Sequence, residues 1–418
     1  MLRSAMLKQA FTYRDGWLFC DEVPLRDIAR DIGTPCYVYS RNAIVENYQR
    51  FRSAFAELDP LICYSVKANS NLAILKVLKE EGSGFDVVSG GELYRLKRIG
   101  ADWNKVVFSG VGKSTGELRM AIDLAIRSIN VESVQELEAL TQLAAERGAC
   151  PSIAFRVNPD VEAQSHPYTV TGLRQHKFGL DLEQARRLAS ILKTSRDVNV
   201  TGLGFHIGSQ ILEIQPFINA FERLKQLAEE FREAGLPIEH LDLGGGIGIP
   251  YRDEKAADLD SYARYLKEHR GDYQLLFEPG RFIVGNAGVL VNQVLYHKTN
   301  HGKHFVIVDG AMNDLMRPSL YQAHHEILSP EERSKSVTAD VVGPVCETGD
   351  FFARDRILPR FVPGDYLAVM NAGAYGFPLS SNYNSRPRAA EVLVEGSTFR
   401  VIRQRESFED LVRGEEII

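Results

Sequence analysis

The chain has 418 residues, enough for two or three domains with sizeable cores, which excludes a small scaffold held together by disulfides or a metal ion. It carries 49 Lys and Arg against 55 Asp and Glu, a net charge of -6 with no basic block, so no nucleic-acid partner is expected. The amino-terminal segment lacks the apolar stretch of a signal peptide, and no run approaches the ~20 apolar residues of a membrane span. We therefore expect a cytoplasmic protein with no membrane partner. Its five cysteines lack CxxC spacing and predict neither a disulfide framework nor a metal site.

Between about residues 60 and 280, short apolar runs alternate with longer segments of helical periodicity, the pattern of parallel βα units. Strands are predicted at 61–66, 85–88, 106–109, 128–131, 152–157, 200–206, 240–243 and 273–277. Helices are predicted at 71–80, 115–126, 133–147, 182–193, 216–234 and 259–269. Eight such strands over ~220 residues indicate an α/β fold of the (β/α)8 TIM-like barrel type, because an open doubly wound sheet usually has fewer.

After residue 281 the pattern changes to closely spaced strand-like runs separated by turn signals. Strands are predicted at 282–284, 289–297, 304–309, 336–342, 365–370, 389–394 and 398–403. Scarce helical periodicity indicates an all-β sandwich or Greek-key barrel, to which an edge strand at 16–20 is expected to belong. The predicted domains are a barrel at 36–281 and a β domain formed by 1–35 and 282–418.

Lys67 directly follows the first predicted barrel strand, at the end of the strands where barrel enzymes place their chemistry. In a partly desolvated barrel mouth the pKa of its amine would fall, which would leave the amine able to react with a carbonyl group. An isolated lysine at such a place is more often a solvated loop residue. Whether Lys67 is a reactive amine or a loop lysine therefore depends on the residues at the neighbouring strand ends.

Three further predicted strands end in polar or glycine-rich segments. His206 and Ser209 follow the sixth, the glycine cluster 244–246 follows the seventh, and Glu278 and Arg281 follow the eighth. Glycines let backbone N–H groups approach an anion, and barrels often bind phosphate after their seventh and eighth strands. Taken singly, a glycine triplet is more often a turn, and a strand-end His is more often a packing residue. A buried Glu needs a cationic partner, which Arg281 could also provide.

Together these strand ends supply an amine, an imidazole, a glycine turn and a carboxylate, a set that suits pyridoxal 5'-phosphate (PLP). This cofactor needs a lysine for its aldehyde, N–H groups for its phosphate, a flat group beside its ring and an acid against its pyridine nitrogen. No HExxH-type or clustered His/Cys pattern indicates a competing metal.

Eight motifs resemble, in order, those of the alanine-racemase-like PLP-dependent decarboxylases, most closely those of the branch that acts on diaminopimelate. They are YSVKAN (64–69), FDVVSGGE (85–92), HIGS (206–209), LGGG (243–246), EPGR (278–281), MRPSLY (316–321), GPVCE (343–347) and AGAY (372–375). The resemblance extends from about residue 34 to residue 394, and eight ordered motifs are far more specific than any single one. It implies a PLP-binding barrel and a C-terminal β domain, in agreement with the two patterns above.

The resemblance also implies roles for individual residues. Lys67 would bind the cofactor aldehyde, with Asp86 close to it, His206 against the ring face and Glu278 at the pyridine nitrogen. The residues implied around the cofactor phosphate are Ser209, Gly245, Gly246, Gly280, Arg281 and Tyr375. The residues implied to hold the substrate are Arg281, Arg317, Tyr321, Glu347 and Tyr375, and the implied proton donor is Cys346. The plainer alternatives are core aromatics for the two tyrosines, a surface ion pair for Arg317 and a small buried side chain for Cys346.

The charges of the implied substrate residues indicate which substrate they hold. Arg281, Arg317 and Glu347 together suit a distal carboxylate beside a distal ammonium, whereas a diamine precursor such as ornithine offers only an ammonium. Meso-2,6-diaminopimelate has an amino-acid group at each end. Removal of CO2 from its D-centre leaves L-lysine, which the resemblance implies as the last step of lysine biosynthesis. It also implies a head-to-tail homodimer in which Lys67 and Cys346 meet across the subunit interface, although the sequence alone is compatible with either a cis or a trans arrangement.

Three other functions stay open at this point. A decarboxylase acting on ornithine, arginine or carboxynorspermidine is one, and Glu347 beside Cys346 argues mildly against the ornithine type. A racemase of the same fold is another, but a Tyr base would be expected there in place of Cys346. A catalytically silent PLP-binding homologue is the third, and the intact Lys67, Glu278 and Cys346 argue against it.

Overall fold

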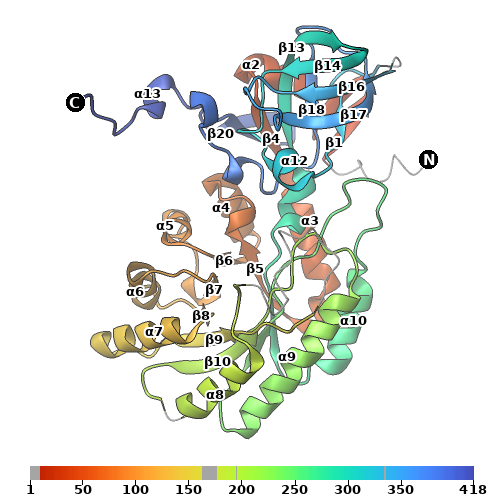
Figure 1. Cartoon of the computed structure of the whole chain (residues 1–418). Helices are drawn as coiled ribbons and strands as arrows, with labels where there is room; N and C mark the ends of the chain where they lie inside the picture. Colours follow the sequence, from red (N-terminus) through yellow and green to blue (C-terminus); the bar gives the residue numbers. More distant parts are fainter. Residues whose placement is uncertain (1–9, 162–176, 194, 334–335) are drawn as a thin grey trace. The chain divides into compact units, whose positions relative to one another are not determined.

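The computed structural model describes residues 10–161, 177–193, 195–333 and 336–418. The chain divides into two compact units (Figure 1). The barrel unit contains Tyr48–Ile249 and Lys255–Phe282, and the β unit contains the chain up to Asn47, Pro250–Glu254 and Ile283–Ile418. No helix within the described ranges combines the length and the apolar character required to span a bilayer.

Eight parallel strands close into a barrel, in sequence order from β5 to β12. Their bounds are β5 (Leu61–Ser65), β6 (Gly84–Val87), β7 (Val106–Phe108), β8 (Ser128–Val131), β9 (Ser152–Arg156), β10 (Asn199–Gly204), β11 (His240–Asp242) and β12 (Gln274–Phe277). Most of their residues are buried, as expected for parallel strands that pack against helices on one side and fill the barrel on the other. The predicted (β/α)8 barrel and its eight strands are confirmed.

Helices alternate with these strands and lie outside the ring (Figure 1). Their bounds are α3 (Arg41–Ala54), α4 (Leu72–Glu80), α5 (Gly90–Ile99), α6 (Thr115–Asp123), α7 (Val134–Arg147), α8 (Leu182–Leu192), α9 (Gln215–Glu233) and α10 (Leu259–His269), with 3-10 turns η1 (Ala56–Leu58), η2 (Val66–Ala68) and η3 (Trp103–Lys105). The six predicted helices are confirmed. The sequence does not predict α5, because it opens with two glycines, which disfavour a helix. The Ser89 hydroxyl caps its first turn by accepting a hydrogen bond from the Glu92 N–H.

The β unit is built on a nine-stranded mixed sheet with the order β17-β16-β14-β13-β4-β19-β20, and β18 pairs with both β13 and β15. The strand bounds are β4 (Cys36–Ser40), β13 (Gly288–Asn300), β14 (Lys303–Val308), β15 (Ile327–Leu328), β16 (Ser336–Val342), β17 (Phe351–Pro359), β18 (Tyr366–Val369), β19 (Ala390–Glu395) and β20 (Thr398–Arg403). A separate three-stranded sheet contains β1 (Phe11–Arg14), β2 (Trp17–Cys20) and β3 (Val23–Pro24). The remaining elements are α2 (Leu25–Ile32), α11 (Arg281–Val284), η4 (Gly285–Ala287), α12 (Arg317–Tyr321), η5 (Phe377–Leu379), η6 (Tyr383–Ser385) and α13 (Phe408–Leu411). The predicted β domain is confirmed.

Three details differ from the sequence predictions. The strand predicted at 282–284 is the helical turn α11, and three consecutive buried apolar residues do not distinguish the two conformations. The run at 16–20 was expected at a sheet edge, but β2 is the central strand of its own sheet because it pairs with both β1 and β3. The barrel domain was predicted to begin at residue 36, whereas β4 pairs with β13 and β19 in the β unit, and the barrel unit begins at Tyr48.

Candidate active site

Lys67 lies in η2, directly after β5, at the carboxyl end of the barrel strands. Its Nζ donates a hydrogen bond to Oδ2 of Asp86, at a distance of 2.7 Å, and Asp86 on β6 is fully buried. The Ser65 hydroxyl donates to the same carboxylate oxygen at 2.8 Å. The barrel therefore holds a half-buried amine in a fixed position at its mouth, beside a buried carboxylate.

Glu278 follows β12 and is only 5% exposed. Its Oε1 accepts a hydrogen bond from the Ser109 hydroxyl at 3.1 Å. Burial, together with the carboxylates of Asp242 and Asp86, raises the pKa of Glu278 well above its usual range, and its hydrogen bond with Asp242 raises it further. Burial and the neighbouring carboxylates thus disfavour the ionised form of Glu278, and a cationic ring nitrogen placed against it would favour that form.

His206 follows β10 and lies beside the glycine cluster. Its Nδ1 accepts a hydrogen bond from the backbone N–H of Gly245 at 3.3 Å. Burial, and then the positive charges of Lys67 and Arg156, lower the pKa of His206 well below its usual range. The ring is therefore a neutral, flat group, as is required beside the face of an aromatic cofactor.

The glycine cluster after β11 approaches neighbouring backbone closely. A Cβ on Gly245 would lie 2.2 Å from the carbonyl oxygen of Glu278, and one on Gly246, which has φ +104°, would lie 2.3 Å from that of Gly208. The Ser209 hydroxyl accepts a hydrogen bond from Arg281 Nη2 at 3.0 Å. A hydroxyl and a guanidinium thus lie with a closely packed glycine turn at the ends of three consecutive strands, and these two donors fit a phosphate group.

Gly280 lies between Glu278 and Arg281 and packs against the residue that follows Lys67. A Cβ on Gly280 would lie 2.9 Å from Cβ of Ala68, the residue after Lys67. Thus all nine candidate residues of the barrel unit lie at the carboxyl ends of the strands or in the turns that follow them: Lys67, Asp86, His206, Ser209, Gly245, Gly246, Glu278, Gly280 and Arg281.

The other candidates belong to the β unit. Arg317 and Tyr321 are the first and last residues of α12, and Cys346 and Glu347 lie in the loop after β16. The Ser319 hydroxyl of α12 donates a hydrogen bond to the carbonyl oxygen of Gly349 at 2.5 Å, which holds the helix beside that loop. Tyr375 has a left-handed backbone with φ +55°, a conformation uncommon for a tyrosine.

Cys346 and Glu347 are both exposed, and the turn η6 holds them in place. The Asn384 side chain accepts a hydrogen bond from the backbone N–H of Cys346 at 3.3 Å, and the Tyr383 hydroxyl donates to Glu347 Oε2 at 2.9 Å. Cys346 is therefore not the small buried side chain of the plainer alternative.

Several polar residues that the sequence interpretation did not select support these candidates. Asn130 Nδ2 donates to the Ser109 hydroxyl at 3.1 Å and to Asp242 Oδ2 at 3.2 Å, and both of these partners contact Glu278. Ser109 follows β7 and Asn130 lies in β8. Both could have been selected from the sequence as polar residues in or directly after predicted barrel strands.

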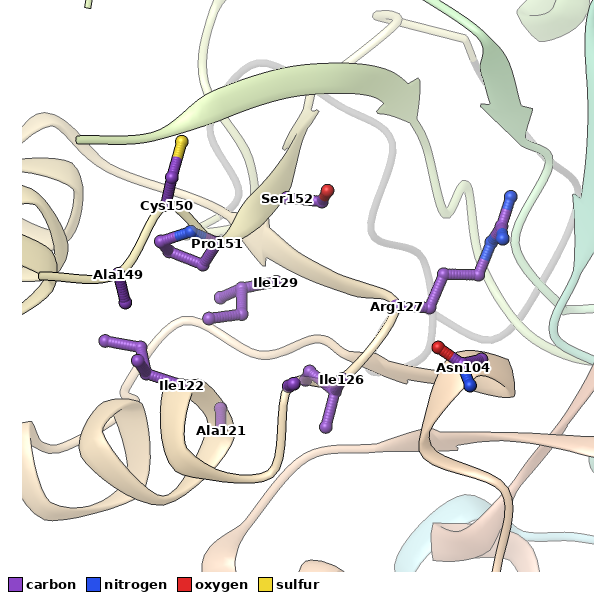
Figure 2. A pocket seen from close by; sticks show the side chains of 11 residues that line it. Asn104, Ala121, Ile122, Ile126, Arg127, Ile129, Ala149, Cys150, Pro151 and Ser152 are labelled. Carbon is purple, nitrogen blue, oxygen red and sulfur yellow. The ribbon is translucent and has the colours of Figure 1, made fainter. Parts of the chain in front are cut away.

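A cavity of about 430 Å³ lies elsewhere in the barrel unit (Figure 2). It is formed by the end of α6 and the segments that lead into β8 and β9, and Arg127, Cys150 and Ser152 are among its lining residues. These residues precede or begin their strands, whereas Lys67 follows its strand, so the cavity is at the opposite end of the parallel barrel.

The chain resembles known proteins over nearly its whole length. The pyridoxal-binding domain of the pyridoxal-dependent decarboxylases matches residues 41–285. The diaminopimelate decarboxylase of Pseudomonas aeruginosa is 48% identical over 411 residues, which cover 98% of this chain and 99% of that protein. The chain belongs to the diaminopimelate decarboxylase family.

Solved structures of diaminopimelate decarboxylases agree with this assignment. The Helicobacter pylori protein complexed with L-lysine gives a TM-score of 0.90 at 42% identity, covering 93% of this chain and 98% of that chain. The M. jannaschii protein in co-complex with L-lysine gives a TM-score of 0.93 at 37% identity, covering 98% of each. The family predicted from the sequence is confirmed, and its cofactor is PLP.

Proposed function

We propose that this protein removes CO2 from the D-centre of meso-2,6-diaminopimelate and releases L-lysine. The observation that carries the proposal is the barrel mouth, where the Lys67 amine, 2.7 Å from Asp86, shares the strand ends with a buried acid and a glycine turn. Membership of the diaminopimelate decarboxylase family supports the choice of substrate.

The barrel residues hold the cofactor in this proposal. Lys67 Nζ would bind its aldehyde, Asp86 would orient that amine, His206 would lie against the ring and Glu278 would face the pyridine nitrogen. The phosphate would be held by Ser209, Gly245, Gly246, Gly280 and Arg281 of the barrel, together with Tyr375 of the β unit. When bound, PLP accepts the electron pair that remains as the carboxylate leaves.

The β-unit residues complete the reaction. Arg317, Tyr321, Glu347 and Tyr375, together with Arg281, bind the distal amino-acid group of the substrate, because a guanidinium matches a carboxylate and Glu347 matches an ammonium. Cys346 Sγ then donates its proton to the carbon that has lost CO2. A neutral thiol can donate this proton as a general acid and is then reprotonated from solvent.

We further propose that the protein acts in the cytoplasm as a homodimer, with Lys67 and Cys346 of one active site coming from different subunits. The resemblance of the sequence motifs to those of the family, which implies a head-to-tail homodimer, supports this arrangement.

The test is incubation of the purified, PLP-loaded protein with meso-diaminopimelate labelled in its carboxyl carbons. We expect labelled CO2 and L-lysine in equal amounts, and no turnover of ornithine, arginine, L-lysine or carboxynorspermidine in parallel assays. Turnover of one of these amines in place of diaminopimelate would contradict the proposed substrate, and racemisation without CO2 release would contradict the reaction class.

A further inference from the structure

Behind the proposed substrate-binding Arg317 lies a histidine that the sequence motifs do not include. Arg317, His325 and Tyr251 form a buried cluster within the β unit, at 5%, 0% and 9% exposure. Arg317 Nη1 lies 2.9 Å from His325 Nε2, and the guanidinium lies over the Tyr251 ring at 4.8 Å from its centroid. The rings of Tyr251 and His325 meet edge to face at 5.4 Å.

The hydrogen bonds of His325 define its protonation state. Its Nδ1 lies 2.7 Å from the carbonyl oxygen of Met370, which can only accept, so Nδ1 carries a hydrogen. Its Nε2 faces Arg317, whose guanidinium can only donate, so Nε2 is an acceptor. His325 is therefore a neutral imidazole with one fixed tautomer.

Backbone contacts also restrain the histidine. Arg356 Nη1 on β17 donates a hydrogen bond to the carbonyl oxygen of His325 at 3.0 Å, and Met370 directly follows β18. Arg356 thus holds the backbone of His325, the Met370 carbonyl holds its imidazole, and the imidazole presents one acceptor to the guanidinium.

We infer that His325 is a positioning residue that orients Arg317 toward the distal carboxylate of the substrate. The inference rests on the proposed function and deepens it. A carboxylate in the place of His325 would also orient the guanidinium, but it would neutralise the charge that an anionic substrate needs. A neutral acceptor, together with the face of Tyr251, fixes the direction of the N–H groups and leaves the full positive charge for the ligand.

Ligand pairs that differ by one carboxylate report this role directly. L-Lysine keeps the carboxylate that Arg317 is proposed to bind, and 1,5-diaminopentane is the same molecule without it. Inhibition constants for both are measured on the PLP-loaded enzyme, alongside KM and kcat for meso-diaminopimelate. The variants are His325→Leu, which removes the acceptor, and His325→Gln, whose side-chain oxygen can reach the position of Nε2.

We expect His325→Leu to raise the inhibition constant of L-lysine and the KM of diaminopimelate about tenfold, since a hydrogen bond to a charged group contributes more than ~1.4 kcal/mol. The inhibition constant of 1,5-diaminopentane and kcat should each change less than about threefold, and His325→Gln should recover most of the loss. His304→Leu is the control: His304 is an exposed histidine of β14 whose ring contacts Thr299, so the control should leave the ratio of the two inhibition constants at its wild-type value.

Double mutants test whether the effect passes through Arg317. In an Arg317→Ala background, which itself raises the KM steeply, His325→Leu should add little, because the two residues act as one unit. If His325→Leu fails to bind PLP, His325→Asn replaces it, since asparagine keeps a donor toward Met370 but does not reach Arg317.

Equal weakening of L-lysine and 1,5-diaminopentane, or a full His325 effect in the Arg317→Ala background, would overturn the inference. Wild-type enzyme that releases no lysine from diaminopimelate would instead contradict the proposed function. The two failures are distinguishable because wild-type turnover is measured before any variant.

Discussion

Among single residues, Cys346 is one of two exposed cysteines, and its surroundings differ from those of the three buried ones. Burial raises the pKa of the Cys20 and Cys63 thiols well above their usual range and that of Cys36 to about 12, which leaves all three inert at neutral pH. Cys346, in contrast, lies on an exposed loop whose backbone is held by Asn384. A proton donor has to be exposed in this way, because the substrate has to reach its thiol.

We predict that Cys346→Ala lowers kcat at least ~100-fold, the usual contribution of a general acid, while PLP absorbance stays at the wild-type level. The matched control is Cys150→Ala, because Cys150 is the other exposed cysteine and lines the cavity of Figure 2 at the opposite end of the barrel. Steady-state kinetics and a visible spectrum of each variant suffice. An unchanged kcat in Cys346→Ala would remove Cys346 from the mechanism.

His240, the first residue of β11, is buried, and no hydrogen bond to its Nε2 is found in the described part of the chain. Burial, and then the charge of Arg127, lowers the pKa of His240 to about 4. Between pH 6.5 and pH 4 the unfolded chain therefore takes up a proton at this residue while the folded protein does not, so the free energy of unfolding falls as the pH decreases through this window.

As the pH falls from 7.5 to 5, His240 should lower the free energy of unfolding by about 2 kcal/mol. Urea unfolding of wild type and His240→Gln at both pH values measures this contribution, because every other titrating group is common to the two proteins. We expect the wild type to lose about 2 kcal/mol more than the variant over this range. Equal losses would mean that His240 titrates normally.

At the scale of elements, the turn after β11 is the part of the site with the least space for a side chain. The Cβ of an alanine at position 245 would lie 2.2 Å from backbone at Glu278, so Gly245→Ala has to displace β12 or the turn itself. We predict that it weakens PLP binding more than about tenfold, measured by titration of the apoenzyme with PLP.

Gly116→Ala in α6 is the matched control, since nothing lies within 4 Å of a Cβ there and alanine favours a helix. It should keep wild-type PLP affinity and stabilise the protein by up to ~1 kcal/mol. PLP affinity in Gly245→Ala equal to that of Gly116→Ala would contradict the role of the turn.

The elements that the sequence predicts correctly are those with one dominant local signal. The barrel strands are buried on both faces, so they form uninterrupted apolar runs, and the capping residue Ser114 marks the start of α6. Where local and tertiary signals conflict, the prediction is incomplete or wrong: α5 opens with glycines, and α11 has the apolar composition of a strand. β17 was not predicted because charged residues interrupt its apolar positions.

For the molecule as a whole, the site follows from the sequence only in part. The sequence indicates Lys67, Glu278 and the glycine turn, because all parallel strands of a barrel end at the same rim. The partners of these residues are not predictable in the same way. Asn130 and Asp242 are 112 residues apart in the sequence. Arg317 begins the short helix α12, and its side chain contacts that of His325 after the helix has ended. Such pairs depend on side-chain directions that a single sequence does not contain.

The proposed dimer predicts that two inactive variants restore each other. Lys67→Ala and Cys346→Ala should each be nearly inactive alone. After the two are mixed and reassociated at equal concentrations, about a quarter of wild-type activity should return, because half of the dimers are mixed and each mixed dimer contains one intact site. No recovery, with mixed dimers verified by differential tagging, would place Lys67 and Cys346 of each site in the same subunit.

The most direct test of the central claim, that Lys67 binds PLP covalently, is reduction of the PLP-loaded protein with sodium borohydride followed by peptide mapping. A pyridoxyl group should be found on the peptide that contains Lys67, in about one copy per chain, and it should be absent from that peptide in Lys67→Ala. A pyridoxyl group on another lysine, with the Lys67 peptide unmodified, would contradict the account.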